Sequence, residues 1–430
     1  FMVKLPYEME KGTKVTLITR PRRFGKTLGM SMLESFFDIR KDSRKLFEGL
    51  EIAKNQVLCD AWMNRYPTAF VSFRQVDGLD FTGAYDMLTW VVSELYKRHL
   101  YLLDSDKIDN TDKDIAKQLA RGNASLKDTK GSLMLLTRMM QQHYGKPVIL
   151  LIDEYDVPVA KANNNGYYNE MLDVMKGLMQ ALKDNQALRF AVVTGCLKIA
   201  KESIFTGTNN FVSDTITNSR LSEYFGFVQS EVGQLLKDAD LTEQPDNIKK
   251  WYDGYHFGDF DVYCPWDVMN YMLELQRDPK AKPISYWKNT SDNAIIRSFI
   301  DYAGSTITKK LETLMAGGCI VERVDENLTY DYLHSSEDNL WSTLYLTGYL
   351  TKAREEDYKG DLPDGMVALM IPNAEIKEIF ETTVIKWFDD STKKWNRNAL
   401  FNAVWNGDSE GITKEMNALL RRTISYHDYR

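Results

Sequence analysis

Short apolar runs rich in β-branched residues recur through the first half of the chain and alternate with stretches of helical spacing. The runs are Val15–Ile18, Ala69–Phe73, Val148–Ile152 and Phe190–Val193. Strands that are apolar on both faces are typical of a parallel sheet covered by helices. Helices are expected after the first and second runs and before the third, with apolar faces formed by Leu28, Met32 and Phe36, by Tyr85, Leu88, Val92 and Tyr96, and by Leu133, Leu136 and Met140. The pattern predicts an α/β fold.

Composition limits the class of protein. A chain of 430 residues exceeds one ordinary core, so two or three domains are expected. No apolar run is long enough to cross a membrane, and the N-terminus lacks the pattern of a signal peptide. The four cysteines stand far apart, which argues against a disulfide framework or a zinc cage and favours a cytoplasmic location. A net charge of −7 argues against a chain that coats nucleic acid everywhere, although a local basic site is compatible with it.

Two regions depart from the alternating pattern. The polar stretch 104–130 is expected to form a loop with a short exposed helix. From about Leu235 strands become sparse, tryptophans become frequent and helical spacing dominates, apart from a strand-like run at Ile320–Val324. The segment 374–426 is expected to be helical.

The most specific motif is Arg20-Pro21-Arg22-Arg23-Phe24-Gly25-Lys26-Thr27, between the first strand and the first helix. A phosphate loop needs this placement, because backbone amides and the helix N-terminus cradle phosphates while the lysine and the hydroxyl bind phosphate and magnesium. Arg20 stands where the general pattern has glycine, and the alternative is a basic loop with a chance Gly-Lys-Thr. The predicted phosphate-binding residues are Arg22, Arg23, Phe24, Gly25, Lys26, Thr27 and Leu28.

A second motif, Asp153-Glu154, ends the third strand. There Asp153 and Thr27 would hold magnesium, and Glu154 would polarise the attacking water. Many strands end in acidic residues, so this motif gains its weight from the phosphate loop. One strand, Ala69–Phe73, lies between the two motifs in the sequence, an order that suits the P-loop branch with an extra strand between its lysine-bearing and carboxylate-bearing strands.

Thr194 ends the fourth strand, where a polar residue of that branch senses the terminal phosphate and orients water. The alternative is a hydroxyl that merely caps a strand end. With Lys26 and Glu154, Thr194 completes the predicted catalytic set. Candidate stabilisers of transition-state charge, which could equally be surface groups or contacts to a nucleic-acid backbone, are Arg20, Arg22, Arg23, Lys198 and Arg220.

Taken together, these motifs resemble the AAA-ATPase-like family, whose members have Arg-Pro-Arg-Arg-Phe-Gly-Lys-Ser/Thr in place of the leading glycine. Further matches are Leu151–Asp156, Val193–Gly195, Tyr224–Phe227, Trp251–Tyr255, Tyr263–Trp266, Tyr286–Ser291 and Leu346–Leu350. The resemblance implies a P-loop NTPase core with helices on both faces of a parallel sheet (1–232), a helical lid (233–300) and a small winged-helix-like α+β domain (301–373). It also implies that 374–430 leads to a nuclease-like domain that is missing from this chain.

The predicted function is ATP binding with magnesium-dependent hydrolysis that moves the C-terminal domains; the preference for ATP rests on the resemblance alone. The alternative is a nucleotide-gated nucleic-acid-binding module with weak or no hydrolysis, acting through the winged-helix-like domain. Many relatives of this ATPase class form rings or dimers, so a homo-oligomer is a candidate state. No membrane partner is expected.

Two features admit a functional and a structural interpretation. Asp364, Glu375 and Lys377 fit the bare spacing of a metal nuclease, which needs Glu375 on a strand; Asn373 as a cap and the spacing after it favour a helix instead. The aromatic motifs Tyr252–His256 and Tyr263–Trp266 could line an adenine or ligand pocket, but packing of the lid against the core by Trp251, Tyr255, Trp266 and Trp287 is favoured.

Overall fold

The computed structural model describes residues 5–6, 12–198, 204–205, 211–241, 245–287, 305–328, 337–393 and 397–423. Its largest sheet is entirely parallel, which confirms the predicted α/β class. The four predicted strands are present, and a fifth, β5, was not predicted. The strand order is β2 (Thr68–Ser72), β3 (Val148–Asp153), β4 (Leu188–Gly195), β1 (Val15–Thr19) and β5 (Phe211–Asp214).

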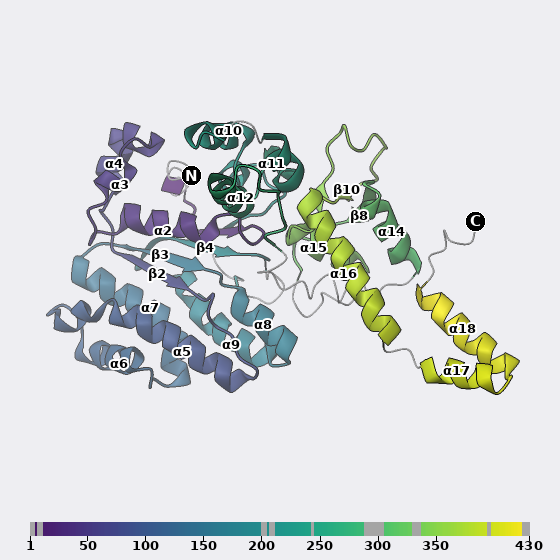
Figure 1. Cartoon of the computed structure of the whole chain (residues 1–430). Coiled ribbons are helices and arrows are strands. Elements are labelled where there is room, and N and C mark those ends of the chain that lie inside the picture. Colours follow the sequence, from purple (N-terminus) through teal and green to yellow (C-terminus); the bar gives the residue numbers. More distant parts are fainter. Residues whose placement is uncertain are drawn as a thin grey trace.

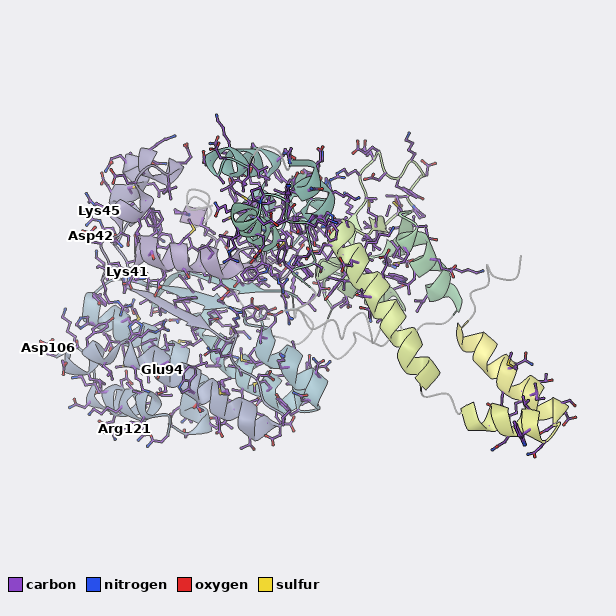
Figure 2. The ribbon with its side chains drawn as sticks, in the orientation of Figure 1. Lys41, Asp42, Lys45, Glu94, Asp106 and Arg121 are labelled. Atoms are coloured by element: carbon purple, nitrogen blue, oxygen red, sulfur yellow. The ribbon has the colours of Figure 1, made fainter. Side chains whose placement is uncertain are left out.

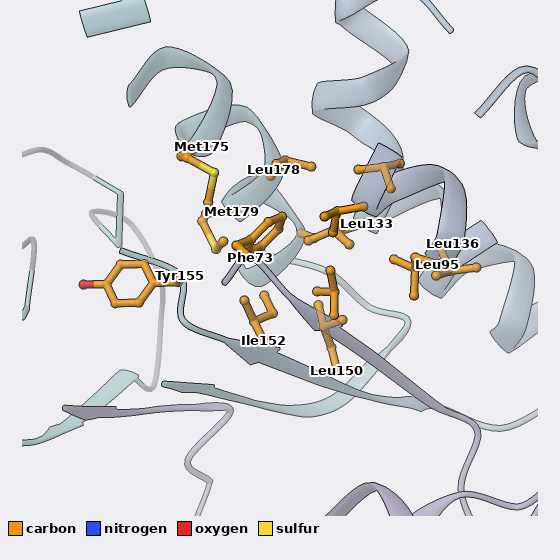
Figure 3. Packing of buried hydrophobic residues seen from close by; sticks show 14 of the residues in the cluster. Phe73, Leu95, Leu133, Leu136, Leu150, Ile152, Tyr155, Met175, Leu178 and Met179 are labelled. Atoms are coloured by element: carbon orange, nitrogen blue, oxygen red, sulfur yellow. The ribbon is translucent and has the colours of Figure 1, made fainter. Parts of the chain in front are cut away.

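Helices cover both faces of the sheet (Figure 1). Successive strand side chains point to opposite faces, so Ile18 and Leu151 pack with α2 (Lys26–Phe37), while Leu17 and Leu150 face the other side. Figure 3 shows that second side, where Leu150 and Ile152 lie beneath Leu133 and Met179. The helices there are α5 (Phe81–Lys97), α7 (Leu126–Tyr144), α8 (Val157–Asn165) and α9 (Tyr168–Met179).

The stretch 104–130, expected to be a loop with a short exposed helix, is mostly helical: it forms α6 (Asn110–Arg121), which buries Leu119, and the start of α7. Both helices are capped, since Asp109 accepts from the amide of Thr111 and Ser125 accepts from the amide of Asp128. The outer faces of the domain carry charged side chains, among them Lys41, Glu94 and Arg121 (Figure 2). Short elements complete this part: α3 (Arg44–Phe47), α4 (Gln56–Trp62) and the 3-10 turns Glu51–Lys54, Leu100–Asp104, Gln180–Leu182 and Ser222–Tyr224.

A helical group follows the sheet. It consists of α10 (Gln229–Asp238), α11 (Pro245–Tyr252), the hairpin β6 (Tyr255–Phe257) and β7 (Phe260–Val262), and α12 (Pro265–Arg277). The helices share a buried cluster that includes Val232, Ile248 and Tyr271. The expected lid limits, 233–300, stay a prediction, and residues 288–300 lie outside the described part of the chain.

A small antiparallel sheet follows, in the order β8 (Ile320–Arg323), β10 (Met366–Met370) and β9 (Thr351–Lys352). It is accompanied by α14 (Ser305–Met315), α15 (Glu337–Leu346) and α16 (Ala374–Lys393), and the last described elements, α17 (Arg397–Trp405) and α18 (Ser409–Thr423), lie away from the large sheet (Figure 1). The winged-helix-like assignment of 301–373 stays a prediction; residues 301–304 and 329–336 are outside the described ranges.

One hydrophobic cluster joins the phosphate loop to these later elements. It contains Phe24 of the loop, Tyr255 of β6, Trp341 of α15 and Phe380 of α16. The loop therefore has one side toward the edge of the parallel sheet and another packed against the C-terminal half of the chain. Among the helices that the structure describes, none has both the length and the apolar character needed to cross a bilayer.

Candidate nucleotide-binding site

The loop between β1 and α2 has the backbone of an anion-binding nest. Arg23 and Gly25 both adopt left-handed conformations, with φ of 74° and 77°, and such turns direct successive backbone amides inward. Gly25 is the N-cap of α2 and has no side chain with which to cap it. The first amides and the positive end of the helix are therefore available to a bound phosphate.

Lys26 lies folded over its own loop. Its ammonium donates to the carbonyls of Arg20 and Pro21, both at 2.9 Å, and lies 3.9 Å from Oε1 of Glu154. Burial disfavours the charge, but the nearby Cys196 and Glu154 outweigh it, so the pKa of Lys26 is raised and the ammonium stays charged. A phosphate in the nest would replace the two carbonyls as the partner of this cation.

Asp153, at the end of β3, gathers hydroxyl groups from three other elements. Thr27 Oγ1 donates to its Oδ2 at 2.8 Å, Ser72 Oγ donates to the same oxygen at 3.2 Å, and Thr194 Oγ1 donates to Oδ1 at 2.5 Å. The two sequence motifs, 126 residues apart, thus meet side chain to side chain. Parallel strands end at the same edge of a sheet, which is why β2, β3 and β4 each contribute one of these groups.

This set of oxygen donors fits magnesium. A carboxylate and a threonine hydroxyl are hard ligands, and Mg²⁺ is usually held by one or two such groups together with water and phosphate oxygens. A metal site formed by protein side chains alone would need at least three histidine, cysteine or acidic ligands. No such group occurs within the described residues. The donor set is that of a metal bound together with a phosphate ligand.

Glu154 follows Asp153 in a strained position. Its φ is 55°, in the left-handed region that residues with a side chain seldom adopt, and such strain is often retained at functional sites. The carboxyl is 14% exposed, and burial raises its pKa while the charge of Lys26 opposes the shift. Water can therefore reach a carboxylate that is held beside the ammonium of Lys26.

The arginines of the loop serve different parts of the molecule. Arg20 is fully buried and points to β5, where its Nη2 donates to Oδ1 of Asp214 at 2.6 Å; Arg220 binds the other oxygen of Asp214 at 3.1 Å. Arg23 donates to the carbonyl of Tyr286 at 2.8 Å. Arg22 is exposed, and its charge opposes the rise that burial causes in the pKa of Glu154.

The remaining predicted residues divide between the interior and the surface. Phe24 is buried against Tyr255, with ring centroids 4.9 Å apart in an edge-to-face arrangement, while Leu28 on α2 is 67% exposed. Tyr255 and Trp287 are buried, as the packing interpretation predicted, whereas Trp266, which that interpretation also included, is 47% exposed. Glu375 lies in the first turn of α16, and this position on a helix contradicts the strand that a metal nuclease requires.

Two contributors were not predicted. Ser72 binds Asp153, and Asp156 organises the segment after β4, because its Oδ2 accepts from the amides of Cys196 and Leu197 at 2.9 and 3.0 Å. The available signal for Ser72 was a hydroxyl at the end of a strand whose partner ends in Asp153. Asp156 belongs to a motif already recognised in the sequence, but its role depends on contacts across forty residues.

Residues 4–205 match a protein family described as "Predicted AAA-ATPase". The chain is also 26% identical, over 371 residues and 86% of its length, to a protein of Azotobacter chroococcum mcd 1 described as "Uncharacterized protein in vnfD 5'region". The aligned region is 62% of that protein, so the chain spans less than two thirds of the length of this relative. No solved structure matches the chain.

Proposed function

We propose that the chain binds ATP with Mg²⁺ and hydrolyses it, on the premise that residues 4–205 match the AAA-ATPase-like family, as the motifs predicted. The family supports a nucleotide-binding, ATPase-like function. The observation that carries the proposal for this chain is the 2.8 Å hydrogen bond between Thr27 and Asp153 beside the nest of Gly25 and Lys26. Distant motifs meet where a nucleotide's phosphates and metal would both need ligands.

In the proposed reaction the chain supplies binding and orientation. The amides from Arg22 to Leu28 would hold the phosphates, and Lys26 would exchange the loop carbonyls for the terminal phosphates. Thr27 and Asp153 would hold the magnesium, which neutralises phosphate charge. Glu154 would orient a water and accept its proton, and Thr194, already bonded to Asp153, would lie next to the terminal phosphate.

Calorimetry with ATP and with GTP, each with and without magnesium, tests the binding step. We expect magnesium-dependent binding of ATP by the unaltered chain, no binding by Lys26→Ala, and unchanged binding by the control Lys45→Ala, whose side chain is exposed away from the loop. Equal binding by Lys26→Ala and the control would refute the assignment of this loop.

A phosphate-release assay tests the chemical step. Glu154→Gln keeps the size of the side chain but cannot accept a proton, so we expect ATP affinity within threefold of the unaltered chain and turnover lower by about 10²–10⁴-fold. Turnover retained in this variant would remove Glu154 from the proposed role.

The nucleic-acid alternative depended on the winged-helix-like segment and the arginines of the loop. Arg20 is fully buried, and the guanidinium of Arg23 lies 5.6 Å from the ring of Trp287, so these two arginines face protein groups. This leaves the ATPase proposal better supported. Salt-dependent DNA binding by this chain would favour the alternative; movement of C-terminal domains, a homo-oligomer and a following nuclease-like domain stay predictions.

A further inference from the structure

The rear of the phosphate loop is held by residues of the C-terminal half. The guanidinium of Arg23 lies 5.6 Å from the ring centroid of Trp287 and 5.9 Å from that of Trp266. On the same side of the loop, Gly348 packs so closely that a Cβ there would lie 2.9 Å from Pro21 and 3.2 Å from Trp287. Trp287 thus contacts Arg23 of the loop and lies beside Gly348, which packs against Pro21.

Trp287 is fixed by two carboxyl groups from two different helices. Its backbone amide donates to Oε1 of Glu375 at 2.9 Å, and its indole Nε1 donates to Oδ2 of Asp267 at 3.0 Å. Asp267 lies in the first turn of α12 and Glu375 in the first turn of α16. Both side chains are inaccessible to solvent, so Trp287 is held by buried hydrogen bonds to both helices.

The two carboxyl groups also face each other. The second oxygen of each, Oδ1 of Asp267 and Oε2 of Glu375, is buried and accepts no hydrogen bond from another described residue. Two adjacent buried carboxylates cannot both keep their charge. Burial and the charge of Asp267 raise the pKa of Glu375 to about 9, and burial raises the pKa of Asp267 to about 6. The two groups therefore titrate as a pair, and near neutral pH one proton between them relieves the repulsion.

The surroundings favour this single proton. Arg23 is the cation that acts on Asp267 and helps it to stay ionised. The other ionisable groups around the pair are kept neutral near pH 7, because burial raises their pKa values; they are Tyr252 of α11, Tyr255 of β6, Cys264 before α12 and Tyr286 beside Trp287.

The start of α16 is tied to the same region by uncharged contacts. Asn373 donates through Nδ2 to the carbonyl of Asp253 at 2.8 Å and accepts the amide of Ile376 at 3.0 Å. Gly254 lies against the carbonyl of Pro372, where a Cβ would come within 1.9 Å. These contacts hold the first turn of α16 in place. A displacement of Trp287 would therefore act on a fixed helix end and not on a loose one.

We propose that Asp267 and Glu375 share one proton and act as a positioning pair that, through Trp287 and Arg23, couples the shape of the phosphate loop to α16. The inference rests on the proposed function only where ATP binding is the quantity measured. While the pair holds the proton, Trp287 keeps its hydrogen bonds to both carboxyl groups and its contact with Arg23, and the loop keeps the shape that binds phosphate. Loss of the proton sets two negative charges against each other, which frees Trp287 and weakens nucleotide binding.

The test compares the unaltered chain with Glu375→Gln between pH 7.5 and 9.5. The glutamine accepts from the amide of Trp287 and donates to Asp267 at any pH in this range, so it mimics the protonated state. We expect the Kd for ATP to rise about tenfold over this range in the unaltered chain, within the usual span of coupling between sites, and by less than threefold in Glu375→Gln. The control Glu381→Gln, exposed on the same helix, should follow the unaltered chain.

A second measurement needs no nucleotide. The pKa of Glu375 is higher in the folded chain than in the unfolded one, so its contribution to stability is greatest in acid and is lost as pH rises through about 9. The urea midpoint should therefore fall more from pH 7.5 to 9.5 in the unaltered chain than in Glu375→Gln. Parallel pH profiles of the two proteins in both measurements would overturn the proposal.

The two measurements separate this inference from the function. If the unaltered chain bound no ATP but the urea profiles diverged, the ATPase assignment would fail and the proton shared by Asp267 and Glu375 would stand. If ATP bound normally and both profiles were parallel, the pair would fail alone. Glu375→Ala should bind ATP about tenfold more weakly at either pH with turnover at saturation unchanged; if it does not fold, the glutamine comparison still decides.

Discussion

Replacing Arg20 by alanine tests what this residue does in a loop where glycine is usual. Arg20 donates to the carboxylate and to the carbonyl of Asp214, at 2.6 and 3.0 Å, and also to the carbonyl of Thr19 at 2.8 Å. Its guanidinium lies 5.3 Å from the ring of Phe225. All of these partners hold the edge strand β5 and the turn after it against β1, so we expect a loss of stability and not of nucleotide recognition.

The magnitude follows from what the substitution leaves behind. Asp214 is 1% exposed, and removing one partner of a buried ion pair costs about 3–5 kcal/mol. Arg220 remains at 3.1 Å from the second oxygen of Asp214 and compensates part of its charge, so we expect the lower end, about 3 kcal/mol. For a domain of this size that corresponds to a melting temperature lower by about 6–12 °C.

Urea unfolding and ATP calorimetry on Arg20→Ala, at a temperature where it is folded, measure the two effects separately. We expect the lower urea midpoint together with an ATP Kd within threefold of the unaltered chain. The pair Arg20→Met with Asp214→Leu should regain most of the stability, because well-packed apolar residues often replace a buried ion pair without loss. Unchanged stability with loss of ATP binding in Arg20→Ala would show that Arg20 acts on the nucleotide and would refute this reasoning.

Three further changes can be measured in the same assays. Thr27→Ala removes the hydroxyl bonded to Asp153 and should abolish the magnesium dependence of ATP binding, whereas Thr27→Ser should retain it. Gly254→Ala would bring a Cβ to 1.9 Å from the carbonyl of Pro372 at a φ of +97° and should lower the free energy of unfolding by about 2 kcal/mol or more; the control Gly131→Ala, in an open helical position, should raise it by up to about 1 kcal/mol. Because burial raises the pKa of Glu154, turnover should fall on acidification at a pH above the ordinary range of glutamate, and a profile set by an ordinary glutamate would contradict this.

The central strands could be predicted because they are buried on both faces. Each then appears as a continuous apolar run, and β1 and β3 were located to within one residue at each end. The edge strand β5, Phe211–Asp214, is only partly buried and offers two apolar residues in a row, too few for a signal. The extent of helix in the α6 region was underestimated for a different reason: its composition is polar, and the narrow apolar face with Ala116 and Leu119 and the caps at Asp109 and Ser125 are weak signals of helices.

The part of the candidate site that could be predicted consists of residues at or just after the carboxyl ends of the strands. Asp153 and Thr194 lie at the carboxyl ends of β3 and β4, and Thr27 opens the helix that follows β1, so parallel pairing brings these positions together. The partner of Arg20 could not be predicted, because Asp214 lies 194 residues away on the strand that the sequence did not indicate. The same holds for Trp287 and Glu375, which are 88 residues apart and meet only when α16 packs behind the loop.

The phosphate loop therefore has two chemically distinct sides. The side that faces the sheet edge carries Lys26 and Thr27, which any P-loop needs, and short motifs predict it well. The opposite side carries Pro21, Arg23 and Phe24, whose partners lie in β6, in α12, after α12 and after α15. A loop that only bound phosphate would not need a buried aromatic ring and a guanidinium packed against tryptophans. The larger residues in this loop are accounted for if its second task is to hold the C-terminal half, and that task predicts that Arg23→Ala weakens the coupling of ATP binding to α16 more than it weakens ATP binding itself.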